Sequence, residues 1–195
     1  MELLSDLIYI DDYGLLGKNF YWRRREVYNV TEEELKTAGI LNDRVQVHVD
    51  IIEPLKVADK KFQERGMRIF IQEGWRPEAL YRLIKDKRTT KEGKDEIDKL
   101  FNFVDMPHAL GRSVYICPWD PIKDAQIYTR KGEDGNDALF VDFYKDKHDA
   151  LSGQYQELQV LMINTMISCG FRLGTKREYF HFDYRPDEPE NYGNR

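Results

Sequence analysis

The chain has 195 residues, which is long enough to bury a hydrophobic core and short enough for one domain. Its 30 basic and 35 acidic residues give a formal net charge of −5 and are spread along the sequence, so nothing indicates a nucleic-acid partner. The two cysteines lie in apolar segments without Cys-x-x-Cys spacing, and we find neither a signal peptide nor an apolar run of membrane-spanning length, which predicts a reduced, cytoplasmic protein without a membrane anchor.

Hydrophobic periodicity and turn residues divide the chain into short segments of helix and strand. In chain order we predict a strand at 7–10, a helix at 30–39, a strand at 44–52, a helix at 53–66, a strand at 67–72, a helix from Pro77 to 87, a helix at 94–104, a strand at 113–117, a loop or hairpin at 118–137, a strand at 138–144, a helix at 155–170, a strand at 177–184 and a surface tail at 186–195. Thr31 and Glu34 have capping-box spacing, and Gly66 and Gly170 end two of the helices. This order favours a single α+β domain over residues 1–195, with a mostly antiparallel sheet, helices packed on one face and the other face open for a site.

Four histidines are the first candidates for chemistry, and two of them have a polar companion at a meaningful spacing. His48 lies in an alternating strand and His148 lies among charged residues, which favours structural and solvated roles for them. His108 precedes the strand at 113–117, and His181 follows Glu178 in the tetrapeptide EYFH.

Glu178 and His181 are of the residue types that a zinc hydrolase needs. Such an enzyme uses neutral nitrogen or anionic oxygen ligands, leaves one position open for water, and has an unligated carboxylate that takes the proton of that water. Residues three apart in a regular strand point to opposite faces, so the pairing requires Glu178 to stand at the start of the strand or at a bulge.

The strand after His108 places Ser113, Tyr115 and Cys117 on one face, while the alternate residues point into the core. This face is the natural place for further ligands or for substrate contacts.

Three short motifs occur in a meaningful order: GWRP at 74–77, MPHALGRSVY at 106–115 and EYFH at 178–181. They are similar to the Tyr-Arg-Pro, Ser-x-His-x-x-Gly-x-Ala-x-Asp and Glu-x-x-His motifs of the D-alanyl-D-alanine dipeptidase (VanX-like) family of zinc peptidases, which shares a fold with the Hedgehog signalling domain. The resemblance extends through FVDFY at 140–144 and covers residues 45–184, whereas the N-terminal part of the chain is not matched.

The resemblance implies a zinc-dependent dipeptidase that acts on D-alanyl-D-alanine or related small peptides. It implies that His108 and His181 bind one zinc ion and that Glu178 is the general base. Arg76 would stabilise the oxyanion of the tetrahedral intermediate, although it could instead pair with a nearby acid. Asp142 would face the free amine of the dipeptide, although it could instead cap a loop.

The chain departs from the family pattern at three positions. Met106 replaces a serine, and Ser113, which would line the substrate site, replaces an alanine. Tyr115 stands where the family has its third zinc ligand, an aspartate seven residues after the first histidine. Tyrosine has a pKa of about 10, so it must lose its proton to the metal before it can supply the negative charge of an aspartate.

Three outcomes are open at this position: a displaced site with Tyr115 as ligand, a third ligand recruited from elsewhere, or no tight zinc binding. Cys117, Asp120 and His148 are the possible recruits. The main alternative to an enzyme is a metal-deficient, non-catalytic relative that binds a peptidoglycan-type peptide or a protein partner in the same cleft. A third alternative is an α+β domain in which the motifs occur by accident.

Overall fold

The computed structural model describes residues 6–92 and 106–187. Its strands are β1 Leu7–Tyr9, β2 Leu16–Gly17, β3 Gln46–His48, β4 Arg68–Glu73, β5 Ser113–Asp120, β6 Ala125–Gln126, β7 Phe171–Leu173 and β8 His181–Tyr184. Its α-helices are α1 Phe20–Arg23, α2 Glu32–Thr37, α3 Ile52–Gln63, α4 Glu78–Glu92 and α6 Ala150–Ile167, and its 3-10 turns are η1 Ile10–Tyr13, η2 Val49–Ile51, η3 Pro107–Leu110 and η4 Asp137–Leu139. Within these residues, every helix is too short or too polar to cross a lipid bilayer.

The larger sheet has the strand order β2, β4, β5, β8, β7, and β6 forms a hairpin with β5. β2 pairs with β4 in parallel, while the other neighbouring strands of this sheet pair antiparallel. β1 and β3 form a separate antiparallel pair. The predicted α+β class with a mostly antiparallel sheet is therefore confirmed. Of the loop or hairpin predicted at 118–137, the structure shows a hairpin between β5 and β6.

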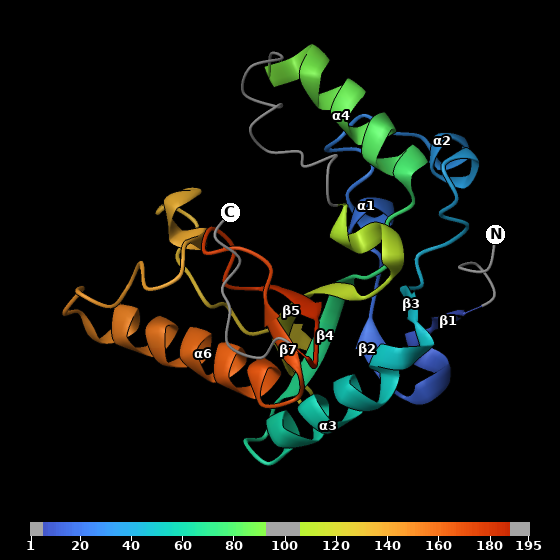
Figure 1. The fold of residues 1–195 in the computed structure, drawn as a ribbon. Helices are drawn as coiled ribbons and strands as arrows, with labels where there is room; N and C mark the ends of the chain where they lie inside the picture. The colour runs from blue at the N-terminus through green and yellow to red at the C-terminus, as the bar shows by residue number, and fades with distance from the viewer. Residues whose placement is uncertain (1–5, 93–105, 188–195) are drawn as a thin grey trace.

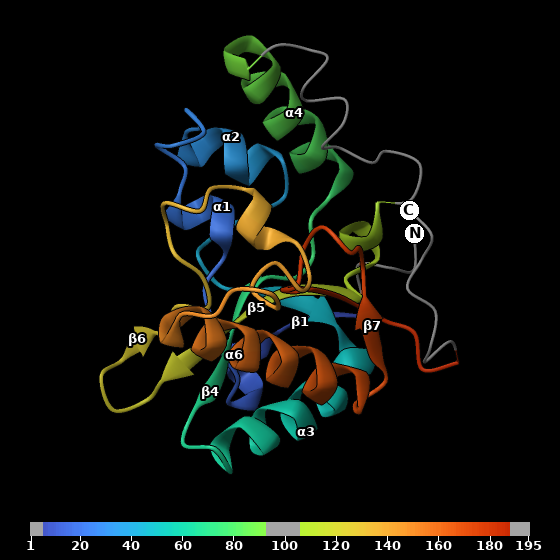
Figure 2. The ribbon, with the colours of Figure 1, turned by 90° about the vertical axis from the view of Figure 1, so that its left-hand side faces the viewer.

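Helices lie on both sides of the larger sheet (Figures 1 and 2). α3 and α6 lie along one face, where their apolar side chains meet those of the sheet in the main core. Representative members of this core are Leu55, Phe62, Met162, Met166, Ile71, Ile116 and Phe182. α1, α2 and α4 lie on the other side and enclose a smaller core around Leu35 and Leu80. The predicted arrangement of helices on one face thus describes α3 and α6 but not the other three helices.

One local signal in the sequence acts as predicted, and a buried carboxylate fixes the following helix. Thr31 accepts a hydrogen bond from the Glu34 N–H, and the Glu34 carboxylate accepts one from the Thr31 N–H, so the capping box starts α2. In α3, the carboxylate of Asp59 is buried and accepts hydrogen bonds from Arg68 and from the backbone N–H of Ile69. These bonds attach α3 to the start of β4 and satisfy a charge that burial would otherwise penalise.

Several elements differ from the prediction. Residues 138–144 form η4 and further turns instead of a strand. Their backbone bonds instead to the segment before β8, since the Tyr179 N–H donates to Leu139 O and the Val141 N–H donates to Lys176 O. The strands predicted at 44–52 and 177–184 are shortened to β3 and β8, and the short strand β7 was not predicted. The helix predicted at 94–104 lies outside the described residues.

Candidate functional site

The predicted site residues of β5 and β8 lie side by side on one face of the sheet. Ser113 is directly opposite Asp183 in the ladder, and Tyr115 is directly opposite His181. Directly opposite residues project on the same side of the sheet. Because Val114 and its alternate neighbours pack in the main core with α3 and α6, these four side chains lie on the opposite face.

His108 reaches this face from η3 and is almost completely buried, with 1% of its surface exposed. Its Nδ1–H donates a 2.7 Å hydrogen bond to the carbonyl oxygen of Gly74, which leaves a lone pair on Nε2. Nε2 is buried and has no hydrogen-bond partner. Burial and the charge of Arg76 lower the pKa of His108 well below its usual value, so the ring is neutral.

Gly111 makes the turn that joins His108 to β5. Its φ of +69° lies in the left-handed region, and a Cβ at this position would lie 2.9 Å from the backbone nitrogen of His48. The carbonyl of Gly111 accepts a 2.8 Å hydrogen bond from that same nitrogen. Close backbone approach is therefore the physical reason for a glycine at this place in the motif.

Glu178 lies in the turn before β8, which is the position that the pairing with His181 requires. Its Oε2 accepts a 3.1 Å hydrogen bond from Nδ1 of His181 and a 3.4 Å hydrogen bond from the hydroxyl of Tyr115. The rings of His108 and His181 stack with centroids 4.9 Å apart, and Tyr115 contacts both rings edge-on. We call His108, Tyr115, Glu178 and His181 the histidine cluster.

His181 lies between two carboxylates, of which sequence reasoning identified only Glu178. Its Nε2 is 3.2 Å from Oδ1 of Asp183, which is an ion-pair distance, although the angle is outside hydrogen-bond geometry. Burial would lower the pKa of His181, but Asp183 and Glu178 outweigh it and raise this pKa to about 9. The sequence signal for Asp183 was its place two residues after His181, on the same face of the strand.

Arg76 is paired with an acidic side chain, which was the predicted alternative to a role in stabilising the oxyanion. Its Nε and Nη2 each donate a 2.6 Å hydrogen bond to the carboxylate of Glu73, and both side chains are buried. A register shift between Ile71 and Glu73 brings Glu73 opposite Tyr115, on the face of the histidine cluster. The guanidinium carbon lies 5.7 Å from the ring centre of Tyr115, so Arg76 adjoins the cluster, and its Nη1 is outside the pair with Glu73.

The two histidines fit a zinc ion, and the third predicted ligand does not. Nε2 of His108 is buried without a partner while its Nδ1–H is fixed on a carbonyl, which is typical of a metal-bound histidine. His181 has a carboxylate beside each ring nitrogen, so one nitrogen would bind the metal in place of its proton while the other keeps its carboxylate. Burial and the charge of Glu178 raise the pKa of Tyr115 well above its usual value, so in the metal-free protein its phenol is neutral and donates a hydrogen bond to Glu178. Across residues 6–92 and 106–187, no three His, Cys, Asp or Glu side chains stand as a metal-binding group.

The possible recruits for the third position lie elsewhere or are engaged. The thiol of Cys117 accepts a hydrogen bond from Gln72, and burial raises its pKa to about 12. The carboxylate of Asp120 accepts hydrogen bonds from the N–H groups of Ile122 and Lys123, and His148 is exposed in the turns before α6. Besides Glu178, the carboxylate that stands beside His181 is that of Asp183.

Asp142 also stands apart from the histidine cluster. It is exposed in the turns before α6, and its carboxylate accepts a 3.0 Å hydrogen bond from Gln156 of that helix. The structure therefore brings together His108, Tyr115, Glu178, His181 and Arg76, with Ser113 beside them, but not Asp142.

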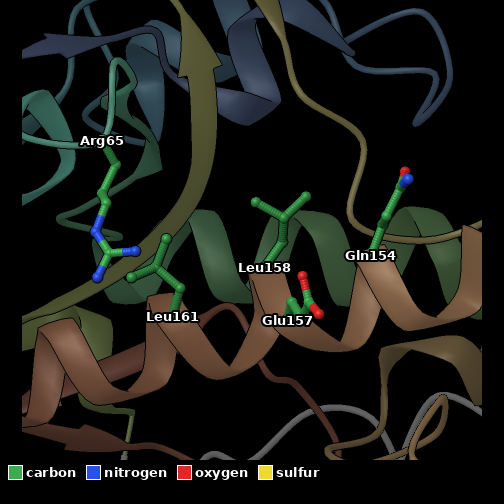
Figure 3. Close-up of a pocket in the computed structure, with 5 residues that line it drawn as sticks. All are labelled: Arg65, Gln154, Glu157, Leu158 and Leu161. Carbon is green, nitrogen blue, oxygen red and sulfur yellow. The ribbon is translucent and has the colours of Figure 1, made fainter.

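A shallow pocket of about 370 Å³ is lined by Arg65 and by Gln154, Glu157, Leu158 and Leu161 of α6 (Figure 3). Arg65 lies in the turn after α3, and α3 and α6 cover the opposite face of the sheet from the histidine cluster. The pocket therefore adds nothing to the candidate site.

Gly174 lies against His181, and its replacement by alanine should disturb the site. A Cβ at Gly174 would lie 2.8 Å from Nδ1 and from Cε1 of the imidazole. We expect Gly174→Ala to displace the ring and to lower the free energy of unfolding by about 1–3 kcal/mol. Urea unfolding and the NMR shifts of the His181 ring would measure this.

The matched control is Gly153→Ala in α6, where a Cβ meets nothing within 4 Å. That change should raise the free energy of unfolding by about 0.5–1 kcal/mol because alanine favours the helix. Equal stability of the two variants would show that Gly174 does not constrain His181.

No protein-family model matches the chain, and a search of curated proteins found no match.

Proposed function

We propose that this protein is a D-alanyl-D-alanine dipeptidase-like hydrolase that acts on small D-amino-acid peptides, with zinc held by His108 and His181. One observation carries the proposal. Apart from Asp142, the residues that the resemblance assigns to the site come from three separate segments of the chain, yet His108, Glu178 and His181 are in mutual contact through Tyr115 and Arg76 adjoins them. Accidental motif matches would have no reason to converge on one face of the sheet.

The residues of the site have the charges that this reaction needs. When bound, zinc would polarise the scissile carbonyl and lower the pKa of a water molecule. Burial opposes ionisation of Glu178, but the bond from His181, the charge of Arg76 and the bond from Tyr115 lower the pKa of this carboxyl. The contributions of Arg76 and Tyr115 would remain when His181 binds zinc, so Oε2 would be available to accept a proton. Arg76 is permanently charged and, with Nη1 outside its pair with Glu73, would stabilise a developing oxyanion.

The test is elemental analysis combined with hydrolysis of D-alanyl-D-alanine, before and after chelation. We expect bound zinc in the purified protein, release of D-alanine, loss of this activity with a chelator and its return when zinc is restored. L-alanyl-L-alanine serves as the control substrate. Protein that gains neither zinc nor activity on reconstitution would contradict the proposal.

The neutral phenol of Tyr115 favours a second candidate, a metal-deficient relative that binds a small peptide in the same cleft without cleaving it. The same experiment separates the two when Tyr115→Asp is included. If the wild type takes up no zinc and this variant does, the second candidate is supported. If the wild type already binds zinc tightly and the substitution leaves that affinity unchanged, the second candidate fails.

A further inference from the structure

A buried pair of side chains, Ser113 and Asp183, stands behind His181 on the side away from Glu178. The hydroxyl of Ser113 donates a 2.6 Å hydrogen bond to Oδ1 of Asp183. Ser113 is 1% exposed and Asp183 is 7% exposed. Because the two residues are directly opposite in the β5–β8 ladder, the backbone register itself holds the carboxylate in place.

The two nitrogens of His181 face different carboxylates. Nε2 lies 3.2 Å from Oδ1 of Asp183, while Nδ1 lies 3.1 Å from Oε2 of Glu178. Glu178 also accepts the hydrogen bond of Tyr115, so the Nδ1 side is where the histidine cluster converges. Which nitrogen of a histidine is free for a ligand depends on what the other nitrogen is bonded to.

Within this site Asp183 contacts Ser113 and His181. Histidines that bind a metal usually donate their other ring N–H to a carboxylate or a carbonyl, which fixes the ring and its tautomer. His108 already shows this arrangement through the carbonyl of Gly74. Asp183 stands 3.2 Å from Nε2 of His181, at an angle outside hydrogen-bond geometry, so it is placed to accept the Nε2–H after a small rotation of the ring. Hydrogen bonds of a site often align only when a ligand is bound.

We propose that Ser113 and Asp183 are positioning residues that hold the Nε2–H of His181, so that Nδ1 is presented to the histidine cluster. A zinc ion bound there would take the place of the Nδ1 proton that His181 donates to Glu178. The part of this inference that concerns zinc rests on the proposed function. It also gives a reason for a serine where the resembled family has alanine: the hydroxyl anchors a carboxylate that the neighbouring strand supplies. In this proposal Asp183 supports the ligand His181. It does not replace the third zinc ligand of the resembled family, whose position Tyr115 occupies in this chain.

The test is Asp183→Asn, which keeps the shape of the side chain but removes its charge and adds an N–H that competes for the ring nitrogen. The protein carries ¹⁵N-labelled histidine and is studied both metal-free and with zinc added. In the wild type we expect a slowly exchanging Nε2–H resonance of His181 in both forms. In the variant we expect that resonance to be lost, and zinc affinity, measured by chelator competition, to fall about 10- to 100-fold.

Two further variants complete the design. Ser113→Ala leaves the carboxylate but removes its anchor, so it should weaken the Nε2–H signal and zinc binding less than Asp183→Asn does. It also keeps the test valid if Asp183→Asn does not fold. Asp86→Asn, on the exposed surface of α4, is the matched control and should change neither quantity.

The outcomes separate this inference from the proposed function. If Asp183→Asn and Ser113→Ala fold but keep the wild-type Nε2–H resonance and zinc affinity, the positioning role is wrong even when the wild type is a zinc enzyme. If the wild type binds no zinc but its Nε2–H resonance disappears in Asp183→Asn, the proposed function fails and the positioning role stands.

Discussion

Replacement of Glu73 by glutamine should lower the free energy of unfolding by about 3–5 kcal/mol. Glu73 is fully buried and Arg76 is 6% exposed, so the variant would keep a buried guanidinium without its counter-charge. Arg76 cannot escape this cost by losing its proton, because a guanidinium is always charged, and the rings of Tyr21 and Tyr81 still surround it in the variant. Urea unfolding monitored by circular dichroism would measure the loss.

The control for this prediction is Glu78→Gln, because Glu78 forms the same kind of pair with Arg82 on the exposed surface of α4. That change should cost no more than about 0.5 kcal/mol. The double variant Glu73→Gln with Arg76→Met should recover much of the lost stability, since it removes the unpaired charge. Similar losses for Glu73→Gln and Glu78→Gln would show that the buried pair is not a stabilising feature.

The second large effect is expected at Glu178. If the proposed function is correct, Glu178→Gln should reduce kcat/KM for D-alanyl-D-alanine by about 10²- to 10⁴-fold, because an amide cannot take a proton. Glutamine can still accept the hydrogen bond from Nδ1 of His181, so the variant should keep the fold. The rate must be compared at equal zinc content, determined for each sample.

Glu157→Gln in α6 is the same chemical change far from the histidine cluster and should leave kcat/KM unchanged. Activity of Glu178→Gln close to that of the wild type would remove Glu178 from the role of general base. It would leave its hydrogen bonds to His181 and Tyr115 as structural contacts.

Elements with strong local signals could be predicted from the sequence. The capping box at Thr31 and Glu34 starts α2, and the apolar face of α3 is buried as its periodicity indicates. Such signals depend on residues within one or two turns of helix. The segment at 138–144 has a β-like composition but forms turns, because its backbone partners are in the distant segment before β8.

In the candidate site, too, some features could be predicted from the local sequence and others depend on distant segments of the chain. The requirement that Glu178 stand before the strand followed from the alternation of strand side chains, and the structure agrees. Glu73 was missed because regular alternation would turn it into the core, and only the register shift after Ile71 brings it to the site. Asp183 was missed because its role in the site depends on its cross-strand neighbour, Ser113, which is far away in the sequence.

By itself, the sequence determined the helices α2, α3, α4 and α6, the α+β class and the residues worth considering, because these depend on residue type and short-range spacing. Only the tertiary structure decided which charges are neighbours. It pairs Arg76 with Glu73 and places His181 between Glu178 and Asp183, since strand register joins residues that the sequence keeps far apart. It also keeps the phenol of Tyr115 neutral, because burial sets its pKa, and burial is a property of the folded chain.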